Sequence, residues 1–261
     1  MTRRILFTAI IAVLPTLWIE GAFAADLPTP QTILDRFIEV TGGKAAYEAR
    51  KNETVKGTVE VGAVGLKGTV ESYYQEPGKY YTSMDLAGVG KFESGLIDGV
   101  AWENSVLQGP RIKTGEEKAQ AVREAAMNIP FRWHDLFAKA ETVGEESVDG
   151  QPCYKVIMTP AQGNPVTMFF DEKSGLMIKT SVVAASQLGD IPSETISKEY
   201  KNFGGILEPS RITGKAAGQE LSFTIESVKG NEEIPPERFA LPEGVKALLA
   251  RQEKESSAKK N

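Results

Sequence analysis

The stretch PVTMFFDEKSGLMIKTSVV, residues 165–183, contains two runs of β-forming residues separated by a polar turn. The turn DEKSG, residues 171–175, ends in glycine, and such a polar run supplies the backbone conformations that a β-hairpin needs. The stretch therefore predicts two antiparallel strands joined by a short turn.

Both strands of this hairpin have apolar side chains on both faces. Side chains alternate along a strand, so Val166, Met168 and Phe170 point to one side and Phe169 to the other. In the second strand, Ile178 follows the apolar Met177. An antiparallel sheet usually keeps one face in water. We therefore expect another part of the chain to cover or fill the second apolar face.

The first 24 residues have the pattern of a secretory signal peptide. Two arginines at positions 3 and 4 precede an apolar run over residues 5–19, and residues 22–24, AFA, have the small-x-small form of a cleavage site. A retained membrane anchor is the alternative, but spanning a bilayer takes roughly 20 apolar residues, and Pro15 interrupts this run. We predict cleavage after Ala24 and export.

Charge and cysteine content narrow the class of protein. The chain has 261 residues and a formal net charge of −5, which disfavours nucleic acid and anionic membrane surfaces as partners. Its single cysteine, Cys153, has no partner for an internal disulfide, and we expect a small buried core residue there, not a reactive thiol. The exported protein must then be stabilised by packing.

Apolar periodicity changes from helical to strand-like near residue 50. Thr29-Pro30 is a helix-start signal and Gly42-Gly43 a stop signal, and a short helical piece follows at 44–50. From Val55 onward, apolar residues alternate with polar ones between glycine-rich turns spaced by about 8–12 residues, which is typical of a sandwich or barrel.

We predict about eleven strands in a single mainly β domain over residues 25–244. No tandem repeat or low-complexity linker divides residues 26–242. The tail, residues 245–261, is rich in charge and is predicted to be disordered.

One insertion, between Thr114 and Ala138, has helical instead of strand-like composition. It predicts two consecutive helices with Pro130 in the first turn of the second. That second helix contains Phe131, and its spacing puts Trp133, Leu136 and Phe137 together on one apolar face. Either this surface packs on the sheet as ordinary core, or helix and sheet enclose a space that an apolar ligand can enter.

Catalytic motifs are nearly absent. The single histidine, His134, leaves too few imidazoles for a zinc site and one candidate base for a triad. The glycine-rich segments 42–44 and 88–91 lack the further residues of a nucleotide-binding loop. We therefore predict no catalytic residue, no metal and no cofactor, and a protein that is not an enzyme. An exposed His134 in a cleft beside a carboxylate would favour the enzyme alternative.

An ordered set of turn motifs resembles a known family. A first helix that ends in Gly-Gly is followed by DGVAW (98–102), VDGQPCYKV (148–156), FFDEKSGLMIK (169–179), EYKNFGGILEPSRI (199–212) and IPPERFALP (234–242). This succession resembles the exported proteins grouped with the periplasmic outer-membrane lipoprotein carrier, the LolA-like superfamily. The resemblance implies an incomplete, strongly curved antiparallel β-barrel, with helices across its concave side and a hydrophobic cavity between them.

The resemblance also implies a function. Members of the family shield acyl chains in the periplasm, and relatives bind lipids or act as sensing modules with protein partners. We therefore expect a periplasmic, monomeric protein that binds lipid or lipoprotein acyl chains, with a membrane-bound protein to deliver or accept them. The alternative is a protein-interaction or lipid-sensing module of the same fold. The candidate cavity residues are Trp102, Phe131, Trp133, Phe137, Met168, Phe170 and Ile178.

Overall fold

The computed structural model describes residues 26–186 and 189–258, so the predicted signal peptide lies outside the described residues. The helices are α1 (Pro30–Thr41), α2 (Lys44–Ala49), α3 (Gly115–Glu124), α4 (Trp133–Leu136), the 3-10 helix η1 (Pro236–Phe239) and α5 (Glu243–Ala258). The strands are β1 (Asn52–Val61), β2 (Leu66–Gln75), β3 (Lys79–Leu86), β4 (Gly90–Ile97), β5 (Val100–Ser105), β6 (Gly109–Ile112), β7 (Lys139–Val148), β8 (Gln151–Thr159), β9 (Val166–Asp171), β10 (Met177–Ala184), β11 (Ile191–Phe203), β12 (Ile206–Ala216) and β13 (Gln219–Gly230).

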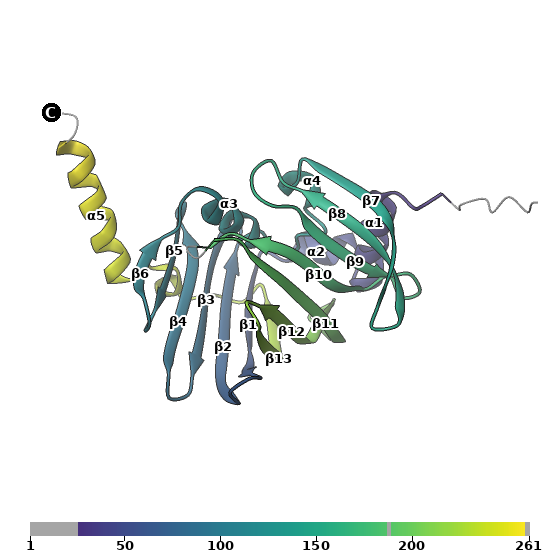
Figure 1. Ribbon diagram of the computed structural model, residues 1–261, viewed down its shortest axis with the longest axis horizontal. Helices are drawn as coiled ribbons and strands as arrows, with labels where there is room; N and C mark the ends of the chain where they lie inside the picture. Colours follow the sequence, from purple (N-terminus) through teal and green to yellow (C-terminus); the bar gives the residue numbers. More distant parts are fainter. Residues whose placement is uncertain (1–25, 187–188, 259–261) are drawn as a thin grey trace, which may run out of the picture.

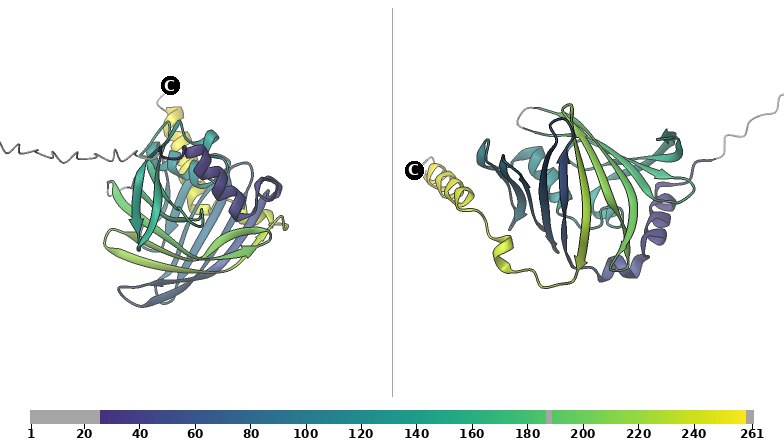
Figure 2. Two further views of the ribbon diagram at one scale, coloured as in Figure 1. Left: turned by 90° about the vertical axis from the view of Figure 1, so that its right-hand side faces the viewer. Right: turned by 90° about the horizontal axis from the view of Figure 1, so that it is seen from below.

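All thirteen strands form one antiparallel sheet that does not close. Their spatial order is β6-β5-β4-β3-β2-β1-β13-β12-β11-β10-β9-β8-β7 (Figure 1). Every pair in the sheet joins strands that are consecutive in the chain except β1 with β13, and the consecutive β6 and β7 lie at the two edges. The sheet is curved, as the views in Figure 2 show. This confirms the predicted fold class, an incomplete antiparallel β-barrel with helices.

Two details of the predicted secondary structure were wrong. The sheet has thirteen strands and not about eleven, because β5 and β6 are short strands whose alternation is hard to see in the sequence. The tail predicted to be disordered begins with α5, which runs to Ala258. Charged residues such as lysine, glutamate and arginine are good helix formers, and Val245 anchors the start of this helix in the core.

The cross-strand register defines two faces of the sheet. Residues directly opposite in neighbouring strands share a face. Tracing the pairs across all thirteen strands places Phe170, Met168, Leu96 and Tyr80 on one face, which we call the inner face. Helix α1 packs on this face, because Phe37 meets Phe170 edge-to-face at 5.7 Å between ring centroids. Helix α3 packs on it as well, through Ala121 against Tyr80 and Leu96.

The helices cover the inner face in two places. Under α1, α2 and α4 lies a large buried cluster that includes Leu34, Phe37, Phe137, Met158, Met168, Phe170 and Ile206. Under α3 lies a smaller cluster of Tyr80, Leu96, Ala101, Ala121 and Ala125. We call these the α1 cluster and the α3 cluster.

The outer face holds two further clusters. Trp102 and Ile97 are buried beneath Val245 at the start of α5, and the Arg238 guanidinium lies 4.9 Å from the ring centroid of Tyr73. The segment that leads to α5 thus covers the outer face of β2–β5.

The second outer cluster shows what covers the second apolar face of the 165–183 hairpin. Phe169 packs with Cys153, Val148 and the half-buried Ile178 on the outer face, while Met168 and Phe170 lie under α1. Lys155 and Lys179 sit over the Phe169 ring, with their Nζ atoms 5.6 and 5.3 Å from its centroid. One apolar face is therefore covered by helices and the other by lysine side chains.

The inserted segment contains less helix than the sequence predicted. Helix α3 is present, but the expected helix over 131–137 is reduced to the single turn α4, Trp133–Leu136. Pro130 lies in the turn before it and not in its first turn. Asn128, with φ of 58°, lies between α3 and α4 and departs from helical geometry there. Among the described helices, none is long and apolar enough to cross a membrane.

We expect Cys153 to react slowly with a thiol reagent in the folded protein. Its side chain is fully buried, and burial followed by the nearby charge of Asp171 raises the pKa of the thiol, so little thiolate is accessible. The measurement is the labelling rate with a chromogenic disulfide, native against denatured. Equal rates in the two states would contradict the structure.

Candidate functional site

The central part of the inner face, between the α1 and α3 clusters, has no helix over it. Val59 and Leu86 are buried there, but its other apolar side chains are half-buried, and in the described structure none of these packs against the four buried clusters. They are Val61, Leu66, Val70, Met84, Phe92, Ile212, Leu221, Phe223 and Ile225, and we call this surface the inner trough. Apolar side chains that face inward without a cover are the feature that most needs an explanation.

A cavity of about 480 Å³ lies over one part of this trough. Val70, Met84, Phe92 and Phe223 supply its apolar lining, and Leu107, 75% exposed, stands at its rim. Small-molecule sites in proteins are mostly apolar and have volumes of about 300–1,000 Å³. The cavity is thus large enough for part or all of one small amphiphilic ligand.

The register arranges the cavity lining in two parallel rows. Val70, Met84 and Phe92 are directly opposite one another and form an apolar row across β2, β3 and β4. The adjacent row, nearer the α3 cluster, is polar in every strand. It runs Ser72, Thr82, Ser94, Glu103, Arg111 across β2 to β6, and we call it the polar row.

The charged end of the polar row is internally paired. Arg111 donates to Glu103 at 2.5 Å and, through both terminal nitrogens, to Glu117 of α3 at 2.8 and 2.6 Å. These hydrogen bonds from Arg111 lower the pKa of Glu117. Lys113 lies 3.5 Å from the second oxygen of Glu103. Two cations and two anions therefore balance at this end, and they fasten α3 to the sheet.

The hydroxyl end of the row is less completely bonded. Ser72 and Thr82 share a hydrogen bond of 2.6 Å. The buried hydroxyl of Tyr80 lies near Ser94 but makes no hydrogen bond of good geometry within the described structure. Burial accordingly raises the pKa of Tyr80 above its ordinary value of 10. Hydrogen-bonding capacity around Ser94 thus remains available beside the apolar row.

A buried arginine holds the α2–β1 junction to β12. Arg50 is 4% exposed, pairs with Glu53 at 3.3 Å and with Glu208, and donates to the Phe203 carbonyl at 2.6 Å. Burial, and then the charge of Glu208, raise the pKa of Glu53 to about 7 in spite of Arg50. Burial also raises the pKa of Glu208. One buried guanidinium is shared by two half-buried carboxylates, which makes this region sensitive to protonation.

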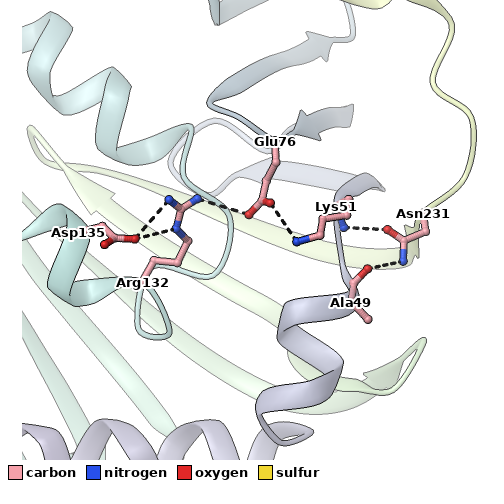
Figure 3. A network of polar contacts seen from close by, with 6 residues as sticks. All are labelled: Ala49, Lys51, Glu76, Arg132, Asp135 and Asn231. Carbon is pink, nitrogen blue, oxygen red and sulfur yellow. Dashed lines mark hydrogen bonds and ion pairs between the residues drawn. The ribbon is translucent and has the colours of Figure 1, made fainter.

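A second polar network ties the α4 region to the strands (Figure 3). Arg132 contacts Glu76, at the end of β2, at 3.4 Å, and Glu76 contacts the Lys51 ammonium at 3.4 Å. The Lys51 amide donates to the Asn231 side chain at 2.7 Å. The chain of contacts joins four segments that are far apart in sequence.

The predicted cavity residues separate into two groups. Phe137, Met168 and Phe170 are buried in the α1 cluster, and Phe131 and Trp133 pack against it. The ligand-binding role that the sequence predicted for these five residues stays a prediction, and the uptake measurement on Trp133→Ala below tests it against ordinary core packing.

Trp102 and Ile178 lie on the other side of the sheet. Trp102 is directly opposite Gly95 and Ile112 and faces α5, so the expectation that it lines the inner face was wrong. Ile178 sits at a β-bulge between Met177 and Lys179, which turns its side chain to the outer cluster.

His134 is exposed and lines a cleft of about 410 Å³ together with the carboxylates Asp35 and Glu39, which is the arrangement that would favour the enzyme alternative. Its direct contacts, however, are with neutral groups. Its Nε2 atom lies 2.8 Å from Oε1 of Gln31, and its ring stacks on Trp133 at 3.6 Å between centroids. In residues 26–186 and 189–258, no ion pair joins His134 to a carboxylate, and no group of three His, Cys, Asp or Glu side chains could hold a metal ion.

The trough residues were missed as a site although the sequence contains their signal. In β1 to β4, apolar Val61, Val70 and Met84 alternate with polar outward residues such as Glu60 and Lys67. This clean alternation marks one face for burial. Because no helix is long enough to cover that whole face, part of it remained available, a fact visible only in three dimensions.

Comparisons with known proteins identify the fold. No family model matches the chain, and no curated protein matches it. Solved structures do match: a DUF1329 family protein from Desulfovibrio piger at 13% identity and TM-score 0.56, covering 80% of this chain and 96% of that one. A LolA superfamily protein from Nitrosomonas europaea matches at 13% identity and a TM-score of 0.55, and the match covers 82% of this chain and 99% of that one. A putative outer membrane lipoprotein-sorting protein domain from Vibrio parahaemolyticus matches at 12% identity and a TM-score of 0.53, and the match covers 80% of this chain and 97% of that one.

These likenesses show that the chain has a LolA-like fold. At identities of 12–13% they carry the fold alone and no residue roles. Function has to be argued from the trough itself.

We expect Trp133→Ala to reduce stability without changing ligand uptake. Trp133 is half-buried against the α1 cluster and does not line the trough cavity. The free energy of unfolding should fall by about 2–3 kcal/mol, less than the roughly 3–5 kcal/mol of a fully buried aromatic. Thermal unfolding and uptake of a fluorescent fatty acid per folded molecule measure the two effects. Impaired uptake at preserved stability would instead support the ligand-accessible space between helix and sheet that the sequence suggested.

We expect Glu53→Gln to remove a pH dependence of stability. The folded pKa of Glu53, about 7, exceeds its ordinary value of 4.5, so its favourable contribution is complete below pH 4.5 and is lost as pH rises to 7. Glutamine cannot ionise, so the melting temperature of the variant minus that of the natural protein should increase from pH 4.5 to 8.

The matched control for Glu53→Gln is Glu60→Gln, an exposed carboxylate on the outer face of the same strand. Its difference curve should stay flat across this range. A flat curve for Glu53→Gln as well would show that the Arg50 pair fully compensates the burial of the carboxylate.

Proposed function

We propose that the protein is a periplasmic binding or carrier protein for a lipid or lipoprotein acyl chain, and that the inner trough holds the chain. The observation that carries this proposal is the uncovered apolar row of Val70, Met84 and Phe92 with Phe223 around the cavity of about 480 Å³. An extended alkyl chain is the kind of ligand that such a surface can shield from water.

Two further observations support the proposal. The LolA-like fold is the fold of a lipoprotein-sorting protein domain from Vibrio parahaemolyticus. The first 24 residues have the sequence pattern of an export signal, which would bring the protein to the compartment where acyl chains need shielding. A membrane-bound protein that delivers or accepts the ligand belongs to the proposal.

The sheet edges support a monomer. Edge strand β6 has four residues, contains Pro110 and is contacted by α5. The other edge strand, β7, carries Lys139, Glu141, Glu145 and Glu146. Short, proline-containing or charged edges resist pairing with a second sheet.

The outer face favours a second candidate function, a protein-interaction or lipid-sensing module. A groove of about 890 Å³ lies between the β7–β8 turn, the β9–β10 turn and β11. Val148, Leu176, Ile178 and Ile196 give it an apolar floor. A protein segment bound there would leave the inner trough free.

Ligand uptake by trough variants tests the proposal. Phe223→Ala should weaken binding of a fluorescent fatty acid by roughly tenfold, because loss of about 1.5 kcal/mol of apolar contact corresponds to that factor. Ile178→Ala, an apolar truncation on the outer face, is the matched control and should bind normally. Folding of both variants is checked by their unfolding midpoints.

Mass spectrometry of lipids extracted from the natively purified protein provides the second measurement. The proposal expects a bound acyl lipid in the natural protein and less of it in Phe223→Ala. Absence of any lipid, together with absence of uptake, would overturn the proposed function and favour the protein-interaction alternative.

A further inference from the structure

We propose that the polar row recognises an uncharged polar group of the bound lipid, a hydroxyl- or ester-bearing group of the acylglycerol class, while the acyl chain lies on the adjacent apolar row. This inference rests on the proposed function and specifies the ligand of the same trough. It follows from the order of side chains across the strands.

The polar row is a continuous feature inside an otherwise apolar surface. Ser72, Thr82 and Ser94 are directly opposite one another on β2, β3 and β4, each one position from the apolar row on the same face. Thr82, Ser94 and Glu103 all line the cavity, as do Met84 and Phe92. A ligand in this cavity therefore touches hydroxyl groups along one side and hydrocarbon along the other.

The hydroxyl groups of the row can form further hydrogen bonds. Thr82 is bonded to Ser72, and Ser94 lies beside the buried Tyr80 hydroxyl, which makes no hydrogen bond of good geometry among the described residues. Polar groups at such a depth are normally hydrogen-bonded, so a ligand group that both donates and accepts would complete the set.

The charges beside the row argue against an anionic group. Glu103 and Glu117 are already balanced by Arg111 and Lys113 through contacts of 2.5 to 3.5 Å. A carboxylate or phosphate placed at Ser94 would lie next to Glu103, its cross-strand neighbour, and would add an unbalanced negative charge. An uncharged hydroxyl or ester group leaves the balance intact.

The position of Phe223 gives the direction of the chain. Phe223 belongs to β13 and lines the same cavity as Met84 and Phe92 of β3 and β4. Half-buried Val61 and Leu221, which are opposite each other on β1 and β13, continue the apolar surface beyond it. The chain would thus cross β3, β2 and β1 toward β13, with its polar end over β3 to β5.

Competition binding tests the inference. The natural protein is loaded with a fluorescent naphthylamine probe and titrated at pH 8 with three ligands of one chain length: monopalmitoylglycerol, palmitate and palmitoyl lysophosphatidylglycerol. We expect the inhibition constant of monopalmitoylglycerol to be at least tenfold lower than that of either anionic ligand.

The variant Ser94→Ala tests the role of the row. It should weaken the binding of monopalmitoylglycerol about fivefold and leave the affinity for palmitate unchanged, because only the uncharged group uses this hydroxyl. Ser222→Ala, which removes a hydroxyl from the outer face of β13 opposite Glu60, is the matched control and should change neither ligand. Unfolding midpoints confirm that both variants fold.

Each other outcome overturns the inference. Palmitate could bind as tightly as monopalmitoylglycerol, or Ser94→Ala could change the affinity for all three ligands equally or for none. Either result would show that the polar row does not recognise the polar group although the trough still binds chains. Tighter anionic binding that Lys113→Met abolishes would assign an anionic ligand. Failure of every ligand to displace the probe would overturn both this inference and the proposed function.

Discussion

The pairing of β1 with β13 is the interaction on which the rest of the structure depends. It joins residues 53–61 to residues 221–230 and converts two separate meanders into one sheet with a continuous inner face. A β-bulge at Lys56–Gly57 lies in this pair, and a Cβ atom on Gly57 would stand 2.2 Å from the Thr224 carbonyl oxygen. Only glycine permits such an approach, so a single small residue allows the two halves to meet. The trough spans this junction, since Phe223 of one half completes a cavity that begins with β2–β5 of the other.

The helices act as fixed supports at two places on the inner face, one on each side of the trough. Gly42, at the end of α1, approaches the β11–β12 turn so closely that a Cβ would lie 2.6 Å from the Gly205 carbonyl oxygen. Helix α3 uses the small side chains of Ala121 and Ala125 to lie flat on Tyr80 and Leu96. The bonds from Arg111 to Glu117 add a charged fastening at its first turn. Because each helix is short and anchored, the centre of the face stays open instead of being filled.

The sequence predicted those features whose causes are local. The caps of α1, the alternation of β1 to β4 and the DEKSG turn depend on neighbouring residues, and they were placed correctly. The features that failed depend on distant contacts or on register. Trp102 could have faced either side, because Ala101 next to it is also apolar, and the cover that decides between them comes from Val245. Alternation could not be counted through Ile178, because a bulge shifts the register by one residue there.

The energetics of a single chain explain why the two rows belong together. Burying about 14 methylene groups yields on the order of 10 kcal/mol, at roughly 0.8 kcal/mol each, while association costs an estimated 4–15 kcal/mol. A trough that is open along one side removes only part of the chain from water, so apolar contact alone leaves little net affinity. Hydrogen bonds contribute about 0.5–1.5 kcal/mol each and, unlike apolar contact, require a fixed orientation. A row of hydroxyls beside the apolar row would therefore set the position of the ligand while keeping affinity low enough for release, which is the balance that a carrier needs.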